Sequence, residues 1–230
     1  MKHKALKAAF RYTIPVMTGY LFLGIAFGVL LYSRGYHFGW AILMSVCIYA
    51  GSMQFVAIDL LASGFNPIVA FFMTLVINAR HLFYGLAMLD RFKGMGRKKP
   101  YMIFSLTDET FSLLCSADVP QGMDGGMFYF LIAFLDQIYW IAGSAIGGIL
   151  GSAFPVSTKG IDFVMTALFV VIFLDQWKSN KEHLPAVTGI CGSFLCLLVF
   201  GSENFILPSM LVILIALAAL KKPIEERCPS

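Results

Sequence analysis

Ionisable side chains interrupt the apolar sequence at two places, and their types suit the binding of a charged small molecule. The first is Asn78-Ala79-Arg80-His81, which has apolar runs on both sides. The second is the pair Asp108-Glu109, in a short stretch with serines at helical spacing. A charged group at mid-bilayer costs roughly 3 kcal/mol or more, so it is tolerated mainly in a bundle interior beside a partner. We therefore expect Arg80 to pair with a carboxylate of the second stretch.

Two interpretations of this charged cluster stay open. In the first, Arg80 orients the carboxylate of a zwitterionic substrate, and His81 or one of Asp108 and Glu109 carries a proton. In the second, the charges form a buried ion pair that only fixes helix positions. The change Arg80→Lys separates them, because lysine keeps the charge but not the planar guanidinium fork. A third possibility for residues 101–115 is a helix on the membrane surface with its acids in water.

Composition places the chain among integral membrane proteins. Its 230 residues are 59% hydrophobic and 13% charged, whereas soluble domains are about 25% charged. Apolar stretches of about 20 residues alternate with short polar joints, which predicts one all-α polytopic domain, a helical bundle in contact with lipid. The net charge of +4 fits basic residues on a cytoplasmic face and not a nucleic-acid surface. The five cysteines show neither a disulfide framework nor metal-ligand spacing, so no metal or cofactor is expected.

Apolar runs and polar joints predict the helical segments. Their approximate limits are 14–32, 40–62, 66–91, 101–115, 128–150, 161–177, 184–200 and 205–220. Glycines four residues apart in the first and fifth segments, Gly24 and Gly28 and then Gly143 and Gly147, would let helix backbones approach closely. Small residues beside Gln54 favour either an unwound point in segment 40–62 or a continuous helix with a small packing face.

The candidate residues follow from this placement. For the substrate or proton pathway they are Gln54, Asn78, Arg80, His81, Asp108 and Glu109. Three acids form a second tier, Asp59, Asp136 and Asp175. Asp136 and Asp175 lie near the ends of their segments, where water is close, which favours solvated side chains.

A weak internal repeat relates residues 9–116 to residues 127–220. Glycine pairs, similar apolar strings, an aspartate and a proline recur in the same order. Eight plain spans starting inside would place the basic loop 91–99 outside, against the positive-inside rule. If segments 40–62 and 161–177 are broken or re-entrant, every basic cluster and the N-terminus are cytoplasmic. The two halves would then form an inverted repeat, as in many secondary transporters.

Four motifs in this order resemble the AzlC family of branched-chain amino-acid permeases. They are GYLFLGIAFG (19–28), YAGSMQF (49–55), NARHLFYG (78–85) and LTDETF (106–111). The resemblance runs from about residue 9 to residue 220. It implies a bacterial plasma-membrane transporter associated with efflux of leucine, isoleucine and valine. It also implies a small hydrophobic membrane partner of the AzlD type.

Residues and resemblance together predict a secondary transporter that exports branched-chain or related neutral amino acids, coupled to protons and working with that partner. A passive channel or facilitator for another small solute is the alternative, and concentrative transport that collapses with an uncoupler would separate the two. An enzyme is not expected, because the sequence offers no serine–histidine pairing, metal-ligand spacing or nucleotide-binding loop.

Overall fold

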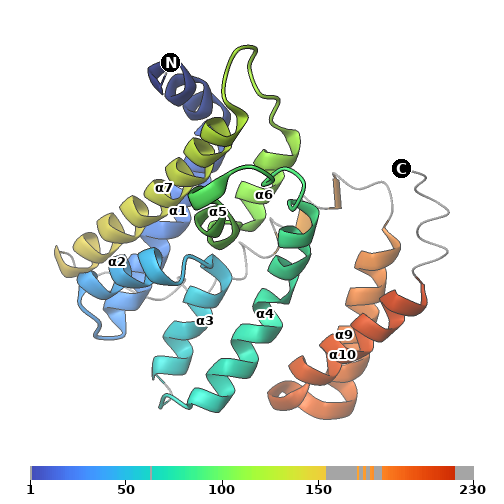
Figure 1. The fold of residues 1–230 in the computed structure, drawn as a ribbon. Helices are drawn as coiled ribbons and strands as arrows, with labels where there is room; N and C mark the ends of the chain where they lie inside the picture. The colour runs from blue at the N-terminus through green and yellow to red at the C-terminus, as the bar shows by residue number, and fades with distance from the viewer. Residues whose placement is uncertain are drawn as a thin grey trace. The chain divides into compact units, whose positions relative to one another are not determined.

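The computed structural model describes residues 2–62, 64–153, 170, 173–174, 177–178 and 183–220. All regular elements among these residues are helices (Figure 1). The chain divides into two compact units, residues 1–162 and 163–230, called here the N-terminal and the C-terminal unit and described separately. The predicted all-α polytopic membrane architecture is confirmed.

Long apolar helices supply the membrane-spanning framework. In the N-terminal unit, α1 (Lys2–Ser33) and α7 (Gly125–Ala153) are long enough to cross a bilayer. In the same unit, α4 (Pro67–Ala87) is capped at its N-terminus by Asn66, whose side chain accepts hydrogen bonds from the backbone N–H groups of Ile68 and Val69. It qualifies as a span only as two arms that meet at a 42° bend.

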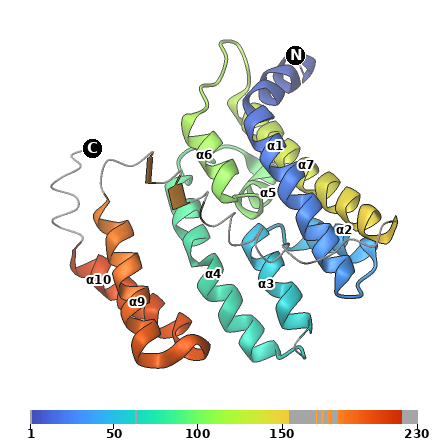
Figure 2. The ribbon, with the colours of Figure 1, turned by 180° about the vertical axis from the view of Figure 1, so that it is seen from behind.

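Helices α1 and α7 lie side by side along their length (Figure 2). Their contact is the glycine seam, formed by Gly24, Gly28, Gly143 and Gly147. A Cβ atom on Gly24 would stand 2.9 Å from the backbone nitrogen of Ser144, and one on Gly28 would overlap the Ser144 carbonyl oxygen. The predicted close approach of the two backbones is confirmed.

The change Gly147→Ala should destabilise this seam strongly. A Cβ atom at this position would overlap the carbonyl oxygen of Ile25 and lie 2.7 Å from its Cα atom. Because the clash is with backbone, the two helices must separate, at a cost of about 1–3 kcal/mol or more. Thermal unfolding in detergent measures the loss. Gly19→Ala on α1 is the control, since nothing lies within 4 Å of its added Cβ atom, and equal unfolding temperatures for the two variants would contradict the prediction.

The segment predicted at 40–62 is broken into α2 (Phe38–Cys47) and α3 (Gly51–Ala62). Between them Tyr49 has φ of 44°, a left-handed conformation that non-glycine residues rarely adopt. The unwound point is therefore present, immediately before the Gly51-Ser52 pair. It places the N-terminus of α3 inside the bundle beside α4 (Figure 1).

The prediction of a single amphipathic helix for residues 101–115 is wrong. The structure has α5 (Lys99–Phe104), which follows a short 3₁₀ turn η1 (Gly96–Lys98), and then α6 (Asp108–Ser116). The chain restarts because the Thr107 hydroxyl accepts a hydrogen bond from the Thr110 N–H at 3.2 Å and caps α6. Leu106 and Leu114 are buried in a core cluster with Phe128 and Ile132 of α7. This cluster fixes the orientation of α6 and hence of its acidic first turn.

The C-terminal unit contains α9 (Leu184–Asn204) and α10 (Ile206–Ala219), which pack against each other. At their contact, a Cβ atom on Gly192 would lie 2.9 Å from Ile213 Cγ1. The predicted segment 161–177 falls almost entirely outside the described residues. The second broken segment and the inverted repeat therefore stay predictions.

Candidate functional site

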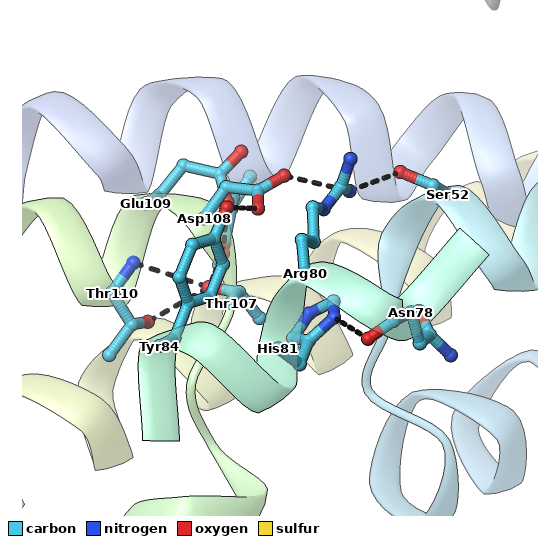
Figure 3. Close-up of polar contacts among 10 residues, drawn as sticks. Ser52, Asn78, Arg80, His81, Tyr84, Thr107, Asp108, Glu109 and Thr110 are labelled. Atoms are coloured by element: carbon cyan, nitrogen blue, oxygen red, sulfur yellow. Dashed lines mark hydrogen bonds and ion pairs between the residues drawn. The ribbon is translucent and has the colours of Figure 1, made fainter. Parts of the chain in front are cut away.

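Arg80 joins the first turns of two half-helices. Its Nη2 atom lies 2.8 Å from Asp108 Oδ2 in α6 and donates a hydrogen bond of 3.1 Å to the Ser52 hydroxyl in α3 (Figure 3). The expected pairing of Arg80 with a carboxylate of the second acidic stretch is confirmed. The Arg80 guanidinium of α4 thus links the N-terminus of α3 to the N-terminus of α6, the two points at which a helix begins again after a break.

Asp108 is held at both oxygens. Besides its contact with Arg80, it accepts a 2.7 Å hydrogen bond at Oδ1 from the Tyr84 hydroxyl, one helical turn along α4. The Tyr84 ring stacks on Phe111 of α6, with ring centroids 4.4 Å apart. The side chain of Asp108 is only 20% exposed, so its acid does not project into water as a surface helix would require.

Two helix N-termini meet at this site. Ser52 lies in the first turn of α3, and Asp108 and Glu109 lie in the first turn of α6. The first N–H groups of a helix have no intrahelical partner and carry the positive end of the helix dipole. Such termini stabilise the two carboxylates of α6 and, at α3, offer donors to an anionic group.

Two polar atoms of the α4 motif are buried and have no hydrogen-bond partner among the residues that the structure describes, Arg80 Nε and Asn78 Oδ1. One is a donor and the other an acceptor. Leaving such an atom unsatisfied costs about 1–3 kcal/mol, so both are candidates for contact with a bound molecule. His81 lies in the same motif and places Nδ1 3.2 Å from the Asn78 carbonyl oxygen.

Glu109 faces a different neighbour from Asp108. It accepts a 2.8 Å hydrogen bond from the Tyr20 hydroxyl of α1, and Tyr20 is 4% exposed. In the part of the chain that the structure describes, the ion pairs do not include Glu109. The two adjacent acids therefore have separate roles, one paired with a cation and one with a neutral hydroxyl.

Gln54 and Asp59 lie away from the Arg80–Asp108 pair. Gln54 is fully buried in another polar cluster, where it accepts a 2.8 Å hydrogen bond from Trp140 Nε1 and donates one of 3.2 Å to Ser45. Asp59 is exposed and lies 3.6 Å from Arg34.

The other second-tier acids have different outcomes. The solvated position expected for Asp136 is wrong, because its side chain has no exposed surface. Its position near the start of an apolar run does not set its depth, since α7 begins before that run and α6 covers it. Asp175 lies outside the described residues.

Sequence reasoning did not select Tyr20, Ser52 and Tyr84 as site residues. Tyr84 is detectable, since it follows Arg80 by four residues and shares its helix face. Ser52 belongs to the small-residue break, but Tyr20 sits in an apolar run with nothing to mark it. Among the described residues, no group of three histidine, cysteine, aspartate or glutamate side chains is arranged to hold a metal ion.

Comparison with known proteins identifies the family. Residues 15–154 match the family described as AzlC protein. The chain belongs to the AzlC family. This match covers the chain from within α1 to the end of α7, including Tyr20, Ser52 and Tyr84, which bond Glu109, Arg80 and Asp108.

Relatives of this AzlC chain occur in several bacteria. The branched-chain amino acid transport protein AzlC of Bacillus subtilis is 51% identical over 96% of the chain and 87% of its own length. An uncharacterized membrane protein of Helicobacter pylori J99 is 43% identical over 96% of the chain and 97% of its own length. The inner membrane protein YgaZ of Escherichia coli is 26% identical over 82% of the chain and 80% of its own length. No solved structure matches the chain.

Proposed function

We propose that this protein is a secondary transporter that exports branched-chain or related neutral amino acids across the bacterial inner membrane. The observation that carries the proposal is the bridge that Arg80 makes between the first turns of α3 and α6. Discontinuous helices whose N-termini meet inside a bundle are a recurrent substrate site of secondary transporters. The name of the Bacillus subtilis relative, a branched-chain amino acid transport protein, supports the substrate class.

The site offers complementary groups to a zwitterion. Arg80 Nε and the N-terminus of α3 suit the carboxylate of an amino acid. Asp108, beside Arg80, suits its ammonium group. An aliphatic side chain would then lie against apolar residues of the bundle, as the proposed substrates valine, leucine and isoleucine require.

We include proton coupling, a cytoplasmic N-terminus and a small AzlD-type membrane partner in the proposal. Coupling is supported by Glu109, whose partner is a neutral hydroxyl instead of a cation, and by His81 beside the Arg80 motif. Buried ionisable groups of this kind serve as proton relays in transporters. The cytoplasmic position of the N-terminus is supported by the basic loop at 91–99. The small partner is supported by the family resemblance.

The test is counterflow of labelled leucine and valine in proteoliposomes, with this chain alone and with the small membrane protein. We expect exchange with the partner present and at least a 30-fold loss in Arg80→Ala, because the change removes the proposed carboxylate ligand and leaves Asp108 without its cation, and a hydrogen bond to a charged group is worth about 1.5–3 kcal/mol. Arg34→Ala is the matched control, because it removes an arginine from an exposed ion pair of the same unit. Absence of exchange in every combination of folded proteins would refute amino-acid transport.

The same proteoliposomes separate transport from a passive facilitator. A proton-coupled exporter accumulates substrate against its gradient when a pH gradient is imposed, and an uncoupler abolishes the accumulation. A facilitator equilibrates the substrate in both conditions.

A further inference from the structure

A continuous series of hydrogen bonds links Glu109 to the buried Asp136. The Tyr20 hydroxyl lies 2.8 Å from Glu109 Oε2 and 2.5 Å from the Thr107 hydroxyl. Thr107 in turn lies 3.0 Å from the Thr110 hydroxyl, which lies 2.9 Å from Asp136 Oδ2. Tyr20, Asp136 and both threonines are buried, and Figure 3 shows the threonine pair beside Glu109.

The number of hydrogens in this series determines whether both of its carboxyl groups can be ionised. Four oxygen–oxygen contacts join five groups, and each contact needs one hydrogen. The three hydroxyls supply one hydrogen each. With both carboxylates ionised, one contact would therefore place two bare oxygens together. One additional proton, on either carboxyl group, completes all four hydrogen bonds.

The additional proton can be on either carboxyl group, and all four hydrogen bonds form in both cases. When Glu109 holds it, every hydrogen bond runs from Glu109 towards Asp136. When Asp136 holds it, every hydrogen bond runs the other way. The conversion breaks one O–H bond and forms one O–H bond at each hydroxyl, so the hydroxyls are unchanged and one proton passes between the carboxyl groups.

The surroundings of Asp136 favour its neutral form. In the described part of the chain, its second oxygen, Oδ1, is buried without a hydrogen-bond partner and Asp136 has no ion pair. The titratable groups close to it are Glu109 of α6, Tyr20 of α1, Tyr49 of the α2–α3 joint, Tyr101 of α5 and Tyr139 of α7. None of these groups is basic, and burying an unpaired anion is costly.

We propose that Asp136 is the proton-binding residue of this transporter and that Tyr20, Thr107 and Thr110 relay the proton between it and Glu109. This inference rests on the proposed proton-coupled transport. Glu109 is the partly exposed end, where protons enter and leave. Asp136 is the closed end, where a proton is retained.

The test is infrared spectroscopy of the purified protein in the C=O stretching region of carboxylic acids, without substrate. We expect a protonated-acid band at neutral pH that Asp136→Asn removes. After a rapid pH change, the intensity of this band should reach its new value about tenfold more slowly in Thr110→Val than in the wild type. This factor corresponds to about 1.4 kcal/mol of added barrier. Thr110→Ser, which keeps the hydroxyl, should restore the rate.

Thr13→Val is the matched control for loss of a buried threonine hydroxyl, since Thr13 is buried and bonds Tyr139 outside the relay. Asp90→Asn controls for the amide substitution at an exposed acid. A band that survives in Asp136→Asn, or a Thr110→Val rate equal to that of the wild type, would overturn the proposal. Because no substrate is used, failure of amino-acid flux with these infrared results intact would refute the proposed function alone.

Discussion

Arg80→Lys is expected to abolish leucine and valine exchange in a protein that still folds. One guanidinium nitrogen contacts both Asp108 and Ser52, and Nε is left for a ligand. A lysine ammonium is a single point charge without the planar fork, so it can keep the pair with Asp108 but cannot also orient a carboxylate. A loss of about 2 kcal/mol or more corresponds to at least a 30-fold lower exchange rate.

Counterflow at matched protein density measures this effect, with monodispersity in detergent as the folding criterion. Arg34→Lys is the conservative control, because its exposed pair with Asp59 lies away from the site. If Arg80→Lys instead retained nearly full exchange, the charge alone would suffice. Arg80 would then belong to an ion pair that only fixes α3, α4 and α6.

Asp136→Asn should uncouple transport without stopping it. An asparagine can donate its side-chain N–H to the Thr110 hydroxyl and so supply the fourth hydrogen of the series with Glu109 ionised. The packing between α6 and α7 is therefore kept, but asparagine cannot release a proton. We therefore expect leucine exchange to continue while accumulation driven by a pH gradient falls to the equilibrium distribution.

The ratio of accumulation to exchange is the decisive quantity here, since a damaged protein loses both together. Thr13→Val should keep the wild-type ratio. Gradient-driven accumulation by a folded Asp136→Asn protein would place the coupling proton elsewhere, with His81 or Glu109 the next candidates.

The Arg80–Asp108 pair could be predicted because an arginine inside an apolar helix requires a partner, and the sequence offers few carboxylates. The sequence did not predict that Asp108 pairs with a cation while Glu109 accepts a hydrogen bond from a neutral hydroxyl. Successive residues of a helix point about 100° apart, so the two acids must meet different neighbours, but the sequence does not say that one neighbour is Tyr20. That contact depends on how α1 packs against α6.

The depth of Asp136 and the helix break before Asp108 were the other failures of sequence reasoning. The break before Asp108 leaves no trace in the serine and acid spacing, because so short an interruption does not disturb the helical period. Asp136 lies near the start of an apolar run, yet burial depends on the neighbouring helices that cover it. The glycine seam was predictable, since glycines four residues apart have few uses other than close helix contact.

The glycine seam also limits how the protein can move. Between α1 and α7 the backbones touch directly, so no layer of side chains is available to slide or repack. The two helices must therefore travel as one rigid body. An alternating-access cycle of the proposed transporter would therefore have to be carried by the interrupted helices α2–α3 and α5–α6 and by the bent α4, and Arg80 of α4 contacts both α3 and α6.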